Sequence, residues 1–173
     1  VVCNAIKIDV TKLGKSDNTG KPYTLQLTEV EAYGDKSNAS ITAPSVDKSE
    51  SNTNTESEVA KPDGENAALG GNVSMEVPKW AENFQAKNLV DGSTKTAVST
   101  EFYTEQNTAE SVTVVFKNGA YKIKTLMLYP RVVGGTVYGF PTDFTISAWN
   151  GTEWVKVHER TGLNKNTAQP VTI

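Results

Sequence analysis

The stretch YTLQLTEVEAYG, residues 23–34, alternates as a β-strand does, contains two carboxylates and ends at a glycine. Its apolar residues follow one phase of the alternation up to Leu27 and the opposite phase from Val30 onward. A phase change inside a strand indicates a β-bulge, here around Thr28–Glu29, because one extra residue turns the following side chains to the other face. The pattern is typical of the closing strand of a domain, yet it stands near the start of this 173-residue chain.

The preceding stretch NAIKIDV, residues 4–10, alternates strictly. Ile6, Ile8 and Val10 face one side, and the charged residues between them face the other. The intervening segment GKSDNTGKP is rich in the residues that favour turns. We therefore expect two antiparallel strands joined by a loop within residues 1–34.

Residues 35–63 consist mainly of Ser, Thr, Asn, Glu and Lys, without an aromatic residue. Such a composition buries too little apolar surface to offset the entropy of ordering, so we interpret this segment as a flexible polar linker.

Residues 64–173 carry strand and turn signals almost throughout, with Asn-Gly pairs of the kind found in hairpin turns. The best helical candidate, residues 80–92, is short. Strands at this spacing predict an all-β sandwich. The clearest strand candidates are SVTVVF (111–116), YKIKTLMLY (121–129), DFTISAW (143–149) and EWVKVH (153–158).

Composition argues against several classes of function. The net charge is −3 and the sequence pI about 5.3, so neither a nucleic acid nor an anionic membrane is an expected partner. One cysteine, Cys3, and one histidine, His158, are too few for a zinc site of the usual kind. There is also no phosphate loop and no dinucleotide fingerprint. Because residue 1 is Val and lies inside a strand pattern, we expect a piece of a longer or processed protein.

The phrase NLVDGSTKTAV, residues 88–98, predicts a tight loop rich in oxygen. Asp91 supplies a carboxylate, Gly92 permits an unusual backbone conformation, and residues with hydroxyl groups follow. Hard cations such as calcium take six to eight oxygen ligands of these types. The alternative is a plain Asx-Gly turn capped by hydroxyl groups.

Arg131 follows a strand and precedes a Gly-rich loop that contains Tyr138. Planar donors beside aromatic rings are suited to binding sugars, which stack an apolar face on a ring and hydrogen-bond through their hydroxyls. The alternative is a solvated loop arginine, with Phe140 in the core. Three further aromatic residues lie in turn-like stretches and are candidates for such stacking: Trp80, Phe102 and Tyr103.

Taken in order, ENAALGGNVS, NLVDGSTKTAV, SVTVVF…YKIKTLMLYPR and GFPTDFTISAWNGTEWVKV resemble the discoidin family. This is the coagulation factor V/VIII type C domain, which includes the bacterial family 32 carbohydrate-binding modules. The chain departs from the family pattern at Val98, where the Asp-Gly loop of the family has Trp. The matching residues are Asn66 to Gly70, Asp91, Gly92, Thr96, Tyr129, Pro130, Arg131, Pro141, Asp143, Phe144, Ile146, Asn150, Gly151 and Trp154.

The resemblance implies a jelly-roll β-sandwich of the galactose-binding-domain type with a structural calcium. In the family, the Asp-Gly loop and a glutamate of the last strand hold that ion. The last strand resembles residues 23–34, so Glu29 is the matching carboxylate and Glu31 is expected to face solvent. The implied ligands are Asp91, Thr96, Glu29 and the carbonyls of Asn88 and Ser93.

On this resemblance, residues 1–34 correspond to the final two strands of a discoidin-type domain, and residues 64–173 to a domain that lacks them. Two arrangements follow: tandem modules cut at both ends, or a circular permutant in which residues 1–34 complete the sandwich. A flexible linker of this length can span such a domain. Closure would also cover an exposed sheet edge, and it requires Glu29 to lie within about 10 Å of Asp91.

The resemblance further implies a non-catalytic carbohydrate-binding module, galactose-type or related, in a larger extracellular or cell-surface protein of bacteria. Its partners would be a glycan and other modules of the same polypeptide. Arg131 would bind sugar hydroxyls, and one or more of the candidate aromatics would stack on the ring. The main alternative is an adhesion or protein-interaction module of the same fold, and a catalytic role comes third.

Overall fold

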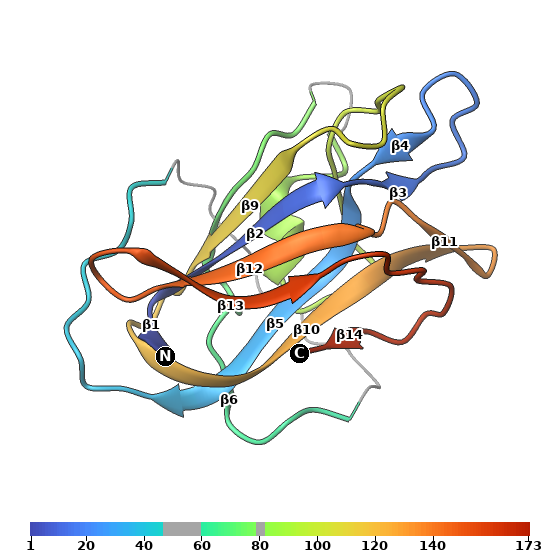
Figure 1. Cartoon of the computed structure of the whole chain (residues 1–173). Coiled ribbons are helices and arrows are strands. Elements are labelled where there is room, and N and C mark those ends of the chain that lie inside the picture. Colours follow the sequence, from blue (N-terminus) through green and yellow to red (C-terminus); the bar gives the residue numbers. More distant parts are fainter. Residues whose placement is uncertain (47–59, 79–81) are drawn as a thin grey trace.

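A computed structural model describes residues 1–46, 60–78 and 82–173. Nearly all regular structure in these residues is antiparallel β-sheet, arranged as two larger sheets and a two-stranded hairpin. Figure 1 shows the two larger sheets as facing layers. The fold is therefore the all-β sandwich that the strand and turn signals predict.

The first sheet is built around β10 (Tyr121–Val133) and β5 (Gln26–Lys36). These two long strands pair with each other, and shorter strands extend the sheet on either side. The shorter strands are β1 (Val2–Cys3), β6 (Glu65–Asn66), β8 (Val98–Ser99), β11 (Thr136–Tyr138) and β14 (Val171–Thr172).

The second sheet has the order β13-β12-β2-β9-β7. Its bounds are β13 (Trp154–Arg160), β12 (Asp143–Trp149), β2 (Ala5–Lys12), β9 (Glu110–Val115) and β7 (Asn72–Ser74). A separate hairpin joins β3 (Gly14–Lys15) to β4 (Tyr23–Thr24).

The N-terminal strands complete the sandwich formed by the C-terminal part of the chain. β2 lies between β9 and β12, with Ile8 opposite Val112 on one side and Ile146 on the other. β5 pairs with β10 over most of its length. Closure within one chain, the permutant-like arrangement, is therefore the observed one, and β2 is the central strand of its sheet.

β5 contains the expected bulge. Leu27 pairs with Pro130 and Glu29 with Tyr129, so Thr28 is the extra residue between two consecutive partners. The Thr28 hydroxyl lies 3.4 Å from the carbonyl oxygen of Pro130. The phase change in the sequence is thus a real register shift, and it determines which way the following carboxylates point.

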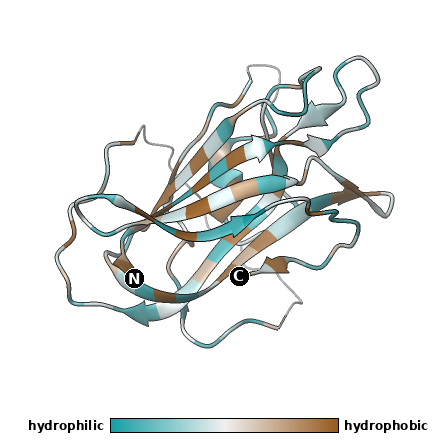
Figure 2. Ribbon diagram, viewed as in Figure 1, coloured by the Kyte–Doolittle hydropathy of each residue, from teal (hydrophilic) through white to brown (hydrophobic). Residues whose placement is uncertain are grey.

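The core lies between the sheets and takes the apolar face of each strand. Ile6, Ile8 and Val10 are each at most 2 % exposed, as the alternation predicts. Phe140 and Phe144 are also buried there. Figure 2 shows the alternation as brown and teal bands along the strands.

The described ends of the polar segment 35–63 contact the sandwich. β5 continues to Lys36, two residues beyond the expected boundary. The Trp149 indole donates to the carbonyl of Thr42 at 2.8 Å, and the Asn4 amide donates to that of Ile41 at 2.8 Å. Residues 47–59 of the expected linker lie outside the described residues.

The expected short helix is a 3₁₀ turn, η1 (Ala86–Val90), within the region predicted as residues 80–92. A search of the described residues finds no helix with the length and apolar character needed to cross a membrane.

The central position of β2 leads to a stability prediction. Replacing Ile8 by Ala removes a fully buried side chain between two paired strands, so we expect the free energy of unfolding to fall by about 2–4 kcal/mol. Thr11→Ala, at an exposed position of the same strand, is the matched control and should change it by less than about 0.5 kcal/mol. Urea unfolding measures both. Equal effects would contradict the central placement of β2.

Candidate functional site

The Asp91 loop is organised by its own hydrogen bonds. It follows η1, and Gly92 adopts a φ of +81°, which favours glycine. Asp91 Oδ1 accepts a hydrogen bond from the Ser93 N–H at 2.9 Å. The Thr96 hydroxyl lies 2.9 Å from Asp91 Oδ2 and 3.2 Å from the Ser93 carbonyl. A carboxylate, a hydroxyl and a carbonyl oxygen therefore converge in one short loop.

Asn88 holds this loop through its side chain. Its amide Nδ2 donates to the carbonyl of Asn83 at 2.9 Å and to that of Ala97 at 2.9 Å, so it ties the two sides of the loop together. Asn88 is buried, and its amide nitrogen is occupied in this bracing. Its main-chain carbonyl remains the atom that the family resemblance implies as a ligand.

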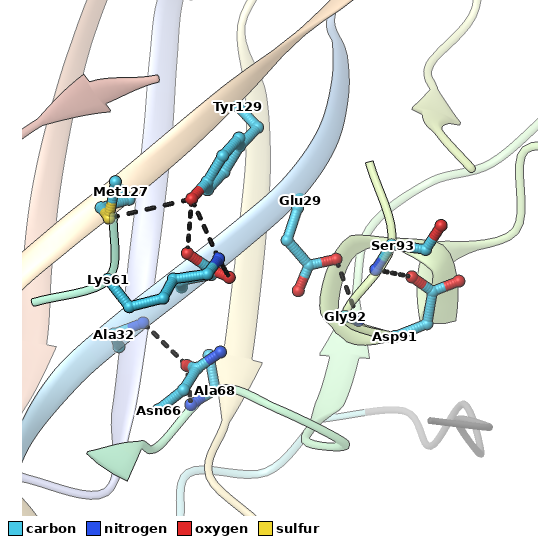
Figure 3. Close-up of polar contacts among 11 residues, drawn as sticks. Glu29, Ala32, Lys61, Asn66, Ala68, Asp91, Gly92, Ser93, Met127 and Tyr129 are labelled. Carbon is cyan, nitrogen blue, oxygen red and sulfur yellow. Dashed lines mark hydrogen bonds and ion pairs between the residues drawn. The ribbon is translucent and has the colours of Figure 1, made fainter. Parts of the chain in front are cut away.

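Glu29 meets the loop from β5. Its side chain is 1 % exposed, and Oε2 accepts a hydrogen bond from the Gly92 N–H at 3.2 Å. Oε1 is buried and has no hydrogen-bond partner among the described residues. Figure 3 shows the Glu29 carboxyl directed at the Asp91 loop. The expected proximity of Glu29 to the Asp91 loop is therefore observed.

Burial and neighbouring charge act together on the acidity of Glu29. Burial, together with the negative charges of Asp91 and Glu31, raises the pKa of its carboxyl to about 10. The hydrogen bond from Gly92 opposes this pKa shift. Burial also raises the pKa of Asp91, against the hydrogen bonds from Thr96 and Ser93. Two desolvated carboxyl groups thus share a site that disfavours the negative charge of either one.

Glu31 does not face solvent, and the expectation that it would is wrong. It is 4 % exposed, accepts a hydrogen bond from the Tyr129 hydroxyl at 2.7 Å and forms an ion pair with Lys61. Residues two apart on a strand point to the same face, so Glu29 and Glu31 both lie on the side of β5 away from the main core. The Lys61 ammonium pairs with the Glu31 carboxylate there.

The donor set of the Asp91 loop suits a hard cation. Calcium prefers several carboxylate, carbonyl and hydroxyl oxygens, and Asp91, Ser93, Thr96 and Glu29 supply all three types. Glu29 Oε1 is an additional buried oxygen that accepts no hydrogen bond from the described residues. Within the described ranges, no cluster of three or more His, Cys, Asp or Glu side chains could hold a metal, so any such site depends on hydroxyl and main-chain oxygens.

Arg131 lies at the wall of a groove of about 470 Å³, which we call the Arg131 groove. Its Nη1 donates to Gln26 Oε1 at 3.1 Å, and the guanidinium carbon lies 5.4 Å from the centre of the Phe84 ring. The guanidinium is therefore held between an amide and an aromatic ring. The groove is lined by Thr28, Asn83, Phe84, Thr94, Lys95, Thr96, Ala97, Arg131, Val132 and Val133.

Of the predicted aromatic residues that the structure describes, only Tyr138 is shown beside Arg131. Tyr138 pairs with Arg131 across the β10–β11 hairpin, so their side chains are neighbours on one face. Tyr103 donates its hydroxyl to Glu110, and neither it nor Phe102 lines the Arg131 groove. Trp80 lies outside the described residues.

Phe84 is the aromatic residue that the sequence analysis missed. It occurs in the stretch WAENFQAKN, where the only available signal was an aromatic residue in a polar, weakly helical segment. Its contact with Arg131 joins positions 47 residues apart in sequence, which no local pattern specifies.

Comparisons with protein-family models, with curated proteins and with solved structures gave no match.

The raised pKa of Glu29 predicts how stability varies with pH in the presence of a chelator. Between its ordinary value of 4.5 and about 10, the unfolded chain binds fewer protons than the folded one, so the free energy of unfolding falls as pH rises. Glu29→Gln removes this dependence. At pH 8 the variant should be more stable by on the order of 2 kcal/mol, with the difference closing toward pH 5.

Urea unfolding at several pH values measures this effect. Glu159→Gln, at an exposed position of β13, is the control and should follow the wild-type curve. If the Glu29→Gln and wild-type curves run parallel, Glu29 does not titrate as a buried group.

Proposed function

We propose that this protein is a non-catalytic carbohydrate-binding module that binds its ligand in the Arg131 groove. The observation that carries the proposal is the placement of Arg131 between the Phe84 ring and the Gln26 amide, at the wall of an open groove. Gln26 is buried and also donates to the Ser99 hydroxyl at 3.0 Å, so it holds the guanidinium from a fixed position.

The other groove residues favour a sugar over an apolar ligand. Thr94 and Asn83 are exposed at the wall and offer hydroxyl and amide groups of the kind that pair with sugar hydroxyls. Phe84, which is half-buried, adds an aromatic ring to the wall beside Arg131. The mixture of one ring and several neutral polar groups supports a binding site that orders hydroxyls.

We propose a non-catalytic role because of the residue types that line the Arg131 groove. Among the described residues lining the Arg131 groove, none is Asp, Glu, His or Cys, the usual sources of general acids and bases. The discoidin resemblance supports the same function, a jelly-roll form of the sandwich, and a place in a larger extracellular or cell-surface protein. Under the adhesion alternative, Val133, 49 % exposed at the rim, would contact a protein partner instead.

We further propose that the Asp91 loop takes a structural calcium. Asp91, Thr96, Glu29 and the carbonyls of Asn88 and Ser93 would hold it, and the ion would neutralise the two desolvated carboxyl groups. Thr96 also lines the Arg131 groove, so a rigid Asp91 loop would fix one wall of the binding site. The ion need not contact the sugar.

Sugar binding predicts a specific response to two substitutions. Arg131→Ala removes the charged donor and Phe84→Ala removes the ring beside it, so each should weaken glycan binding by roughly tenfold or more. Arg160→Ala, at an exposed position of β13 in the opposite sheet, is the matched control and should bind as wild type does. Glycan-array screening followed by titration calorimetry measures the affinities. Absence of binding to any glycan at millimolar concentration would refute the proposed function.

Calcium binding predicts a metal-dependent rise in thermal stability. Calcium added after chelation should raise the Tm of the wild type by roughly 3–8 °C, because the ion binds the folded state alone. Asp91→Asn and Glu29→Gln should each lose most of that increase, whereas the exposed control Glu159→Gln should keep it. Scanning calorimetry checks this, and an equal increase in all four proteins would contradict the site.

A further inference from the structure

The Arg131 groove is built in large part from the loop that contains Asp91. Residues 94–97 of that loop line the groove, and so do Asn83 and Phe84, which precede η1. The turn η1 and Asp91 lie between these two lining segments in sequence. The shape of the groove therefore depends on how η1 and the Asp91 loop hold the two segments.

Asn88 joins the two segments through its side chain. It lies in η1 and is buried, and its Nδ2 donates to the carbonyl oxygens of Asn83 and Ala97, each at 2.9 Å. Both acceptors belong to residues that line the groove. An asparagine amide has two N–H donors, and Asn88 uses one on each segment. A single side chain therefore holds the two lining segments together.

The Asp91 carboxylate connects to the same two segments. Thr96 donates to Asp91 Oδ2 at 2.9 Å and immediately precedes Ala97 in the groove wall. Asp91 is the C-cap of η1, three residues after Asn88. The position of the Asp91 carboxylate is thus linked to one segment by Thr96 and to the other by η1 and the Asn88 amide.

Phe84 extends this linkage to Arg131. It follows Asn83 directly, and its ring centre lies 5.4 Å from the guanidinium carbon of Arg131. Arg131 is held separately, because its Nη1 donates to Gln26 Oε1. The hydrogen bond from Asn88 to the Asn83 carbonyl therefore bears on the position of the Phe84 ring beside the guanidinium.

The groove has one side in regular structure and one side in loops. Residues 131–133 belong to β10 and pair with β11, and Thr28 is fixed against β10, with its hydroxyl 3.4 Å from the Pro130 carbonyl oxygen. The segments 83–84 and 94–97 lie outside every strand and outside η1. The loop side is therefore the one whose order depends on Asn88 and on the state of the Asp91 loop.

We infer that cation binding at the Asp91 loop and ligand binding in the Arg131 groove are energetically coupled, with the Asn88 side-chain amide as the positioning residue between them. This inference rests on the proposed sugar binding and the proposed calcium site, and it adds a regulation of the groove by the ion. An ordered Asp91 loop holds the loop side of the groove in place, so a sugar loses less conformational entropy of the protein when it binds. Coupling is reciprocal, so the sugar strengthens calcium binding by the same factor.

Titration calorimetry of the full chain tests the coupling in both directions. Methyl β-galactoside should bind about fivefold or more tightly in saturating calcium than after chelation. In the reverse experiment, calcium affinity should rise by the same factor when methyl β-galactoside is saturating. Both measurements use the unmodified protein, so they do not depend on how a variant folds.

Asn88→Ala tests the positioning role, because it removes both N–H donors and keeps the main-chain carbonyl that the calcium site would use. The variant should retain a rise in Tm with calcium, yet it should bind methyl β-galactoside weakly and with the same affinity with and without the ion. Asn166→Ala, at an exposed position after β13, is the matched control and should keep the coupling of the wild type.

Hydrogen exchange with calcium alone gives a second measurement that needs no sugar. Calcium should slow exchange in residues 82–85 of the wild type and leave β13 unchanged, because only the former segment is tied to the Asp91 loop. Asn88→Ala should remove this slowing in residues 82–85. Asn88→Asp keeps the shape of the side chain and, when ionised, has no donor, so it replaces Asn88→Ala if that variant does not fold.

Equal affinity of the wild type for methyl β-galactoside with and without calcium would overturn the inference and leave sugar binding intact. Coupling that persists without the Asn88 donors would overturn the role of Asn88. A wild type that binds no calcium would overturn the inference together with the proposed ion site. Failure to bind methyl β-galactoside in either condition would overturn it together with the proposed binding of galactose-type sugars.

Discussion

The antiparallel pairing of β5 with β10 is the constraint on which the other features of this protein depend. The two longest strands form the middle of one sheet, and their register runs from Leu27 opposite Pro130 to Lys36 opposite Tyr121. Both strands extend beyond the core: β5 ends at the polar segment, and β10 continues into the hairpin with Arg131. The pairing has two shifts in register, and the one at Thr28 changes which residues face the main core. Without that shift, Glu29 would point into the core and could not reach the Asp91 loop.

The face of β5 and β10 away from the main core is unusual because it is buried and yet carries charge. Tyr33, Met127 and Tyr129 form a small apolar cluster there, beside the two glutamates of β5. The two carboxyl groups differ in the partners that surround them. Glu31 has an ammonium and a phenol as partners, so its charge is compensated. Glu29 has one backbone N–H and two negative neighbours, so the Gly92 hydrogen bond and the charge of Lys61 offset the cost of its burial only in part. β5 therefore carries two buried carboxylates on one face, two residues apart: Glu31 has a structural role, and Glu29 is the candidate metal ligand.

Sequence reasoning predicted the parts of this structure that depend on local pattern. Alternation in β2, the phase change at Thr28 and the Asn-Gly turns each have a direct physical explanation, and the all-β sandwich was predicted from such signals. Its closure by residues 1–34 was one of two arrangements that the discoidin resemblance implied. Glu31 was placed in solvent because nothing within β5 reveals that a lysine 30 residues later in the chain covers it. Phe84 was missed for the same reason: its partner Arg131 is distant in sequence. Local pattern specifies the strands and their faces, whereas the cover over a face and the neighbours of a groove are set by tertiary contacts.

The unpartnered oxygen of Glu29 bears on whether the Asp91 loop is only a turn or a cation site. If the loop were merely structural, Glu29 would be protonated at neutral pH, and its hydroxyl proton would need an acceptor. The Gly92 N–H already donates to Oε2, and Oε1 has no partner among the described residues, so the protonated acid would bury an unused donor at a cost of about 1–3 kcal/mol. The proposed cation, if bound by Oε1 and Asp91, would remove both this cost and the repulsion between the two carboxyl groups. The plain-turn interpretation explains the hydrogen bonds of Asp91, Ser93 and Thr96, but it gives no reason for a fully buried glutamate beside them.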